Sequence, residues 1–199
     1  MKLSRRTILK GASALPLLGA NFAVPAFAQS TPSAAAADIP PILFVHGNGD
    51  HAALWVTTLW RMESNGMPRE RMFAINFTDP LARSDDAVAQ ENRSSTADQR
   101  RELAEAIKQL KQRTGASRVA LVGNSRGGYA IRNVVKNGGG ADVSHAVLCG
   151  VPNHGVFDWE DNPGNEFNAR APFLRALNSG DSEVTPGTAF LTLRSDGMD

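Results

Sequence analysis

The sequence of 199 residues has little that could cross-link the chain or bind a metal ion. It contains one cysteine, Cys149, so no disulfide can form within the chain. Cys149 lies in an apolar stretch, which favours a small buried side chain over a reactive thiol. One cysteine and four scattered histidines cannot supply a recognisable zinc site. The acidic residues between 158 and 166 lack the spacing of a known calcium loop, so we expect a solvated loop and no metal site.

The sequence also lacks a strongly basic region outside its first residues. The whole chain has 21 basic and 20 acidic side chains, but residues 1–28 carry four of the basic ones and no acidic one. The remainder therefore has 17 basic side chains (21 − 4) against 20 acidic ones, a formal net charge of −3. Such a chain has no basic face to neutralise phosphates, which excludes nucleic acid as an expected partner.

Residues 1–28 have the features of a bacterial export signal. A basic start is followed by a run of apolar and small residues, and Ala26-Phe27-Ala28 fits a cleavage site before Gln29. Residues 4–10, which include the pair Arg5-Arg6, resemble the twin-arginine signal. That resemblance implies the twin-arginine export machinery as a partner and a periplasmic or secreted protein. The alternative is an ordinary secretory signal with a chance arginine pair.

A retained membrane anchor is not expected at the N-terminus. Pro16, Pro25 and the many small residues of residues 1–28 make a poor spanning helix, so we expect no stable membrane span after processing. The composition of residues 29–39 is typical of a short linker. The 171 residues that remain after residue 28 (199 − 28) suit one domain, which we place at 40–199.

From residue 40 onwards, strand and helix patterns alternate. Short apolar runs predict strands, and the helical pattern is clearest over 96–113, where Thr96 and Gln99 could form a capping box and Gly115 could end the helix. This alternation predicts an α/β fold, a mostly parallel sheet with helices on both faces. Residues 151–187 form a long irregular segment, which is usually functional in a compact domain. The predicted strands are 42–45, 71–77, 118–123, 143–149 and 189–193, and the predicted helices are 52–62, 96–113, 129–136 and 173–177.

The most informative motif is Gly123-Asn124-Ser125-Arg126-Gly127. It follows a predicted strand and precedes a predicted helix, which is the context of a nucleophile elbow. In that turn the serine hydroxyl is exposed above the sheet, and glycines are needed on both sides because a Cβ would crowd the serine or a strand. The alternative is a glycine-rich turn with an incidental serine.

Three motifs at 44–49, 123–127 and 150–155 follow the order and spacing of bacterial α/β-hydrolase lipases. Over about 40–199, the sequence resembles the small secreted triacylglycerol lipases and esterases. The resemblance implies Ser125 as nucleophile and the backbone N–H groups of Asn48 and Arg126 as the oxyanion hole, which stabilises the charge on the attacked carbonyl oxygen. Gly47 would allow close approach of the substrate, with Gly123 and Gly127 shaping the elbow. No cofactor is implied, and the expected partner is a small-molecule or lipid ester substrate.

The resemblance also implies a triad acid and a base that follow Ser125 in that order. The acid is expected just after the last predicted strand, where Asp196 and Asp199 are both candidates and the spacing slightly favours Asp199. No histidine follows them, so we expect an incomplete fold without its last strand and helix, and a base beyond residue 199. The order of the triad makes His46 a structural residue of its loop, and His154 an atypical candidate for the base.

Two sets of side chains near these motifs have open roles. Arg126 opposes the positive end of its helix, so we expect it to pair with an acid such as Asp50 or Asp79, or to contact a polar substrate. Large aromatic residues could line an acyl pocket, although packing roles are the more common outcome. These aromatic residues are Trp55, Trp60, Phe157, Trp159, Phe167 and Phe173.

The sequence therefore predicts an exported serine carboxylic ester hydrolase, a lipase or esterase, that forms an acyl-enzyme at Ser125. A polyester depolymerase or a thioesterase would use the same parts. The alternative from a different functional class is a truncated, hydrolase-like fragment with at most a binding role. Such a fragment would be inactive, because loss of the base costs several orders of magnitude in rate.

Overall fold

The computed structural model describes residues 39–156 and 161–195, all within the compact unit Thr31–Asp199. The signal predicted at 1–28 and nearly all of the linker predicted at 29–39 lie outside the described residues. So do Phe157, Trp159 and both candidate acids, Asp196 and Asp199.

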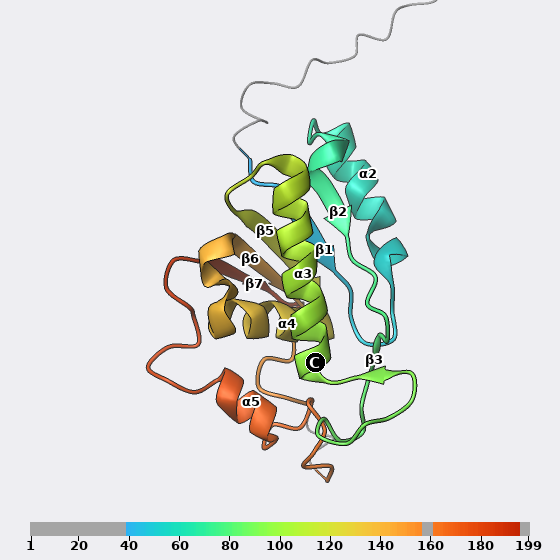
Figure 1. Cartoon of the computed structure of the whole chain (residues 1–199), viewed down its shortest axis with the longest axis vertical. Coiled ribbons are helices and arrows are strands. Elements are labelled where there is room, and N and C mark those ends of the chain that lie inside the picture. The colour runs from blue at the N-terminus through green and yellow to red at the C-terminus, as the bar shows by residue number, and fades with distance from the viewer. Residues whose placement is uncertain (1–38, 157–160, 196–199) are drawn as a thin grey trace, which may run out of the picture. The chain divides into compact units, whose positions relative to one another are not determined.

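Strands and helices alternate along the described part of the chain (Figure 1). The strands are β1 (Ile42–Val45), β2 (Met72–Ala74), β3 (Leu81–Ala82), β4 (Arg93–Ser94), β5 (Val119–Asn124), β6 (Val143–Cys149) and β7 (Ala189–Leu193). The helices are α2 (Val56–Ser64), α3 (Thr96–Thr114), α4 (Arg126–Val134) and α5 (Pro172–Leu177). Short 3₁₀ turns occupy Ala52–Trp55, Arg69–Arg71 and Gly140–Asp142, and a π-type turn at Val135–Gly139 continues α4.

Five of these strands form one parallel sheet in the order β2-β1-β5-β6-β7. The predicted strands at 42–45, 143–149 and 189–193 are confirmed with the same bounds. The strand predicted at 71–77 is shorter, because the chain leaves the sheet after Ala74 and the Phe77 N–H donates to His46 Nε2 at 3.2 Å. The small parallel pair β3–β4, absent from the sequence prediction, lies between β2 and α3 in the chain.

Helices cover both faces of the five-stranded sheet, as the alternating pattern predicted. In β1, Leu43 and Val45 point to one face, where they share a core with α3 and α4. Ile42 and Phe44 point to the other face, where they pack with Leu59 of α2. All four side chains of β1 are buried, which explains why its sequence is a continuous apolar run. In Figure 1, α3 and α4 are seen together in front of the sheet.

Helix α3 begins with a capping box, but not the predicted one. Ser95, rather than Thr96, is the N-cap: its hydroxyl accepts from the Asp98 N–H, and the Asp98 carboxylate accepts from the Ser95 N–H. These hydrogen bonds lower the pKa of Asp98 to about 2. Gln99, the predicted partner of Thr96, is buried instead. The predicted end is confirmed, since Gly115 adopts a left-handed conformation with φ of 68°.

The parallel arrangement gathers the carboxyl ends of the strands at one edge of the sheet. The loops that begin at His46, Ser125 and Gly150 follow the adjacent strands β1, β5 and β6 at that edge. Ligands and catalytic groups collect at this edge in open α/β sheets. Among the described residues, no helix is both long and apolar enough to cross a bilayer.

Candidate active site

The turn between β5 and α4 holds Ser125 in an unusual backbone conformation. Its φ of 51° and ψ of −122° lie outside the regions that L residues normally adopt. Asn92 is the other residue besides glycine with positive φ in the described part of the chain. Such a conformation costs about 1–3 kcal/mol and persists only where the surroundings impose it. The predicted strand–turn–helix context of Ser125 is therefore present.

Three glycines impose this turn by the lack of a side chain. A Cβ on Gly127 would lie 2.5 Å from the Val45 carbonyl oxygen, and one on Gly123 would lie 3.0 Å from the backbone of Gly127. The first distance is shorter than real Cβ contacts and the second is tighter than nearly all of them, so α4 can approach β1 and β5 this closely only with glycine at these positions. Gly128 is equally restricted, because a Cβ there would overlap Val151.

The loop after β1 lies directly beside Ser125. A Cβ built on Gly47 would lie 3.1 Å from Ser125 Cβ and 3.7 Å from Ser125 Oγ. The next residue, Asn48, is exposed, and its Oδ1 accepts from the Ala82 N–H at 2.7 Å. The structure thus brings together the loop and the turn that contain the predicted oxyanion residues, Asn48 and Arg126.

His46 has the structural role that its place in the sequence predicted. It is buried, its Nδ1–H donates to the Gly47 carbonyl at 2.9 Å, and its Nε2 accepts from the Phe77 N–H at 3.2 Å. Burial lowers the pKa of the imidazole, which keeps it neutral as this pattern of one donor and one acceptor requires. Both ring nitrogens are therefore used to hold the loop beside Ser125.

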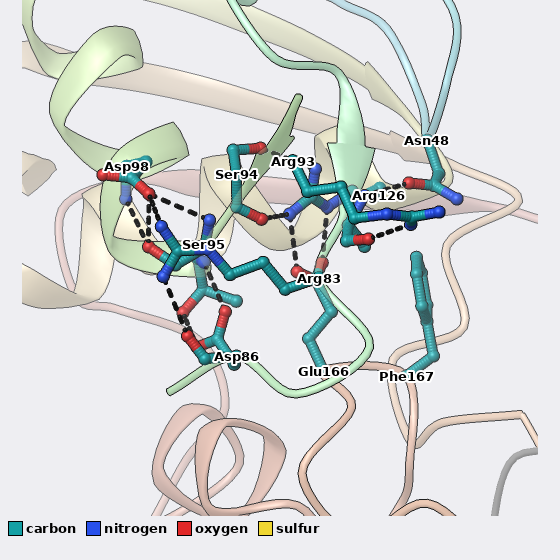
Figure 2. Close-up of polar contacts among 12 residues, drawn as sticks. Asn48, Arg83, Asp86, Arg93, Ser94, Ser95, Asp98, Arg126, Glu166 and Phe167 are labelled. Atoms are coloured by element: carbon teal, nitrogen blue, oxygen red, sulfur yellow. Dashed lines mark hydrogen bonds and ion pairs between the residues drawn. The ribbon is translucent and has the colours of Figure 1, made fainter. Parts of the chain in front are cut away.

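The expected partners of Arg126, Asp50 and Asp79, were wrong. Arg126 is fully buried and forms an ion pair with Glu166, whose oxygens accept from Nε at 2.7 Å and from Nη2 at 2.6 Å. Its side chain turns away from solvent toward the segment 151–187, and Figure 2 shows it between Glu166 and Ser94. Desolvation explains why Arg126 pairs with Glu166, because a buried cation needs a buried anion with complete hydrogen bonding.

The three other histidines have contacts outside the Ser125 turn. His51 caps the 3₁₀ turn Ala52–Trp55, which begins where the helix over 52–62 was predicted to start. His145 is exposed on β6 and contacts Ser144 Oγ. His154 has a side chain that is 74% exposed, and its Nε2 lies 2.8 Å from Glu183 Oε1. None of the hydrogen bonds among the described residues joins an imidazole to Ser125.

A second buried arginine of α4 ties down the segment 151–187. Arg132 donates to Asn153 Oδ1 at 3.2 Å, Asn178 Oδ1 at 2.7 Å and Glu183 Oε2 at 3.1 Å. These acceptors come from three parts of the segment, before and after α5. The segment is thus held against α4 at several points, including the Arg126–Glu166 ion pair.

The described aromatic residues differ in exposure. Trp55 and Phe167 are buried, whereas Trp60 is 65% exposed on α2. Phe167 and Phe173 pack against Tyr129 of α4, so they join the segment 151–187 to the helix. Cys149 is half-buried, and desolvation raises the pKa of its thiol. No group of three or more potential metal ligands occurs within residues 39–156 and 161–195.

The structure therefore brings together Gly47, Asn48, Ser125 and Arg126, with Gly123 and Gly127 packed behind them, while their catalytic roles stay predictions. Glu166 and Ser94, the two side chains that hold Arg126, were not predicted from the sequence. The available signal was the arginine beside the serine, for which pairing with an acid was one of the two predicted roles.

The chain is similar in sequence to a known lipase family. A model of the family described as Lipase (class 2) matches residues 40–156, more than half of the chain. The matched region contains β1, the turn with Ser125, and the residues just after β6.

Solved structures of low sequence identity share the fold. A lipase of Bacillus licheniformis, BlEst2 in its mature form, superposes with a TM-score of 0.56 at 20% identity, covering 82% of this chain and 67% of that one. Phospholipase PlaB of Legionella pneumophila gives 0.55 at 14% identity, and lipase B of Aspergillus fumigatus gives 0.54 at 17% identity. The match to PlaB covers 76% of this chain and 38% of PlaB. The match to lipase B covers 71% of this chain and 34% of lipase B. The sheet, its helices and these neighbours are those of an α/β-hydrolase fold.

Proposed function

The chain belongs to the class 2 lipase family, and on this premise we propose that it is an exported serine hydrolase of carboxylic esters with Ser125 as nucleophile. The observation that supports this proposal best is the conformation of Ser125, which has φ of 51° at the junction of β5 and α4 beside the loop after β1. Lipid esters are the substrate class that the family suggests.

In the proposed reaction, Ser125 Oγ attacks the ester carbonyl carbon and loses its proton to a base. The carbonyl oxygen becomes an oxyanion, which accepts hydrogen bonds from the N–H groups of Asn48 and Arg126. The Arg126 N–H is suited to this role because the first N–H groups of a helix have no partner within the helix. Collapse of the intermediate releases the alcohol, and water then cleaves the acyl-enzyme to the acid and free Ser125. One such N–H donor is worth about 10²- to 10³-fold in kcat.

The triad acid is proposed at Asp196 or Asp199. Its role would be to hold the base in the correct tautomer and to stabilise its charged form. We assign neither His46 nor His154 as the base, because His46 holds its loop through both ring nitrogens and His154 contacts Glu183.

The nucleophile is tested by covalent labelling and by ester hydrolysis. Protein expressed from the whole open reading frame, so that any base encoded after residue 199 is present, would be treated with a fluorophosphonate, and the modified peptide identified by mass spectrometry. Hydrolysis of nitrophenyl esters of increasing acyl length would be measured alongside it. Label on Ser125 and its loss in Ser125→Ala are expected. Ser117→Ala is the matched control, since Ser117 is exposed at the other end of β5. Equal hydrolysis by Ser125→Ala and the unmodified chain would refute the proposal.

Export through the twin-arginine route is proposed from residues 1–28 alone. In a bacterial host, the processed chain should begin at Gln29 and be found in the periplasm or medium. Arg5→Lys combined with Arg6→Lys should retain the precursor in the cytoplasm. Unchanged export of that double variant would favour the ordinary secretory route.

A further inference from the structure

The small sheet β3–β4 contacts both loops that contribute to the proposed oxyanion hole. On one side it binds the side chain of Arg126: Nη1 donates to the Pro80 carbonyl at 3.0 Å and to Ser94 Oγ at 3.0 Å, and Nη2 donates to the Ser94 carbonyl at 2.8 Å. Ser94 is itself buried and donates to the Asp79 carbonyl at 2.5 Å. The residue after Ser125 is therefore fixed to β4 and to the residue that precedes β3.

On the other side, the same sheet binds the loop after β1. Asn48 Oδ1 accepts from the Ala82 N–H at 2.7 Å, and the Gly49 N–H donates to the Pro80 carbonyl at 3.1 Å. That carbonyl also accepts from Arg126 Nη1, so a single peptide group is bonded to both loops. The Arg93 side chain of β4 donates to the Ala82 carbonyl at 2.6 Å and so links β4 to β3. Figure 2 shows Asn48 to the right of Arg126 and Glu166 below it.

Glu166 completes the arrangement from the segment 151–187. Its carboxylate binds Arg126 through two hydrogen bonds, and the side chains of both residues are at most 1% exposed. Neighbouring residues fasten the segment to the chain after β3. Asn165 Nδ2 donates to the Arg83 carbonyl at 3.0 Å, and the Asp86 N–H donates to the Gly164 carbonyl at 2.8 Å. The Glu166 carboxylate is therefore held in place beside Arg126 by its own hydrogen bonds and by those of its neighbours.

We propose that β3–β4 and Glu166 form a brace that sets the separation and direction of the two oxyanion N–H groups. Glu166 and Ser94 are then positioning residues that act through the side chain of Arg126, and the Asn48 side chain positions its own backbone. This inference rests on the proposed function of Ser125. Geometry matters here because a donor must lie within hydrogen-bond distance of the oxyanion, and a shift of about 1 Å can cost 10²-fold in rate.

The test separates positioning of the oxyanion hole from a general effect on folding or binding. For Glu166→Gln, kcat and KM would be measured on an ester and on its thionoester, in which sulfur replaces the carbonyl oxygen. Sulfur accepts hydrogen bonds weakly, so the ratio of ester to thionoester kcat reports on the oxyanion hole. We expect kcat for the ester to fall about 10- to 100-fold, with KM changed less than about threefold and the ratio reduced.

Glu183→Gln is the matched control, because Glu183 also pairs with an arginine of α4 but is 40% exposed. It should keep the ester to thionoester ratio of the unmodified chain. A second variant, Asn48→Ala, covers the case in which Glu166→Gln does not fold. Asn48 is exposed, so its side chain can be removed with little effect on packing, while the hydrogen bond to the Ala82 N–H is lost. It should lower kcat and the ratio in the same direction.

The outcomes distinguish the two proposals. Hydrolysis that depends on Ser125, together with an unchanged ratio in folded Glu166→Gln or in Asn48→Ala, overturns the brace and leaves the nucleophile standing. A reduced ratio in these variants but not in Glu183→Gln supports the brace. If the unmodified protein from the whole open reading frame shows no hydrolysis that depends on Ser125, the proposed function is overturned, and the brace with it.

Discussion

Glu166→Ala should destabilise the fold by leaving the guanidinium of Arg126 buried without its counterion. The substitution removes the two hydrogen bonds of 2.7 and 2.6 Å from a guanidinium that is fully buried and therefore out of contact with bulk water. Breaking one partner of a buried pair costs about 3–5 kcal/mol. The hydrogen bonds from Arg126 to Pro80 and Ser94 remain and partly solvate the cation, so we expect about 3–4 kcal/mol.

Urea unfolding followed by circular dichroism would measure this loss. With a slope of about 2 kcal/mol per molar urea, the midpoint should fall by about 1.5–2 M. Glu183→Ala is the control: its carboxylate is 40% exposed, and Arg132 keeps Asn153 and Asn178 as acceptors. It should cost less than about 1 kcal/mol. If Glu183→Ala shifted the midpoint as far as Glu166→Ala, burial would not be the reason for the loss.

Three further substitutions test other parts of the site. His154→Ala should leave ester hydrolysis within about twofold, since its exposed ring contacts a glutamate and not Ser125; a loss of 10³-fold or more would instead make His154 the base. Burial lowers the pKa of His46 below its ordinary 6.5, so its contribution to stability is complete above that pH and is lost as the pH falls towards the folded pKa. His46→Gln should therefore weaken the fall of Tm between about pH 7 and 5, and an unchanged slope would contradict this. Gly127→Ala should cost about 3 kcal/mol or more in urea unfolding, because its Cβ would lie 2.5 Å from a carbonyl oxygen of β1, whereas Gly115→Ala has open space and should cost only about 1 kcal/mol for its left-handed backbone. Equal costs would rule out that packing constraint.

The sheet was predictable because buried parallel strands have a simple sequence pattern. The four residues of β1 and the seven of β6 are apolar runs or near-runs between polar turns, and the structure gives these strands the predicted bounds. The helix after Ser125 and the capping of α3 were less well defined by sequence. Ser95-Thr96 offers two neighbouring hydroxyls, and the choice of Ser95 depends on Asp98, which also binds Arg83 and Arg101.

The brace could not be predicted, because its strands are too short to leave a pattern. β3 and β4 have two residues each and are held by side chains from distant parts of the chain. Residues Arg126 and Glu166 are 40 positions apart, and many acids were available to the arginine. What selected Glu166 was burial of both groups in the folded protein, a property that a single sequence does not record.

The order of the strands in the sheet has a consequence for how the chain folds. β1 lies between β2 and β5, and Ile42 pairs with both Met72 and Ala120. The second partner strand of β1, which is β5, is therefore synthesised only after β2, β3, β4 and α3. Contacts between such distant residues require closure of a long loop before they stabilise the chain, so folding of this sheet should be slow compared with a helical bundle of the same size. Until β5 is added, one side of the apolar strand β1 stays open to pairing with other chains. The strand that supports the loop beside Ser125 is thus also open to misassembly during synthesis.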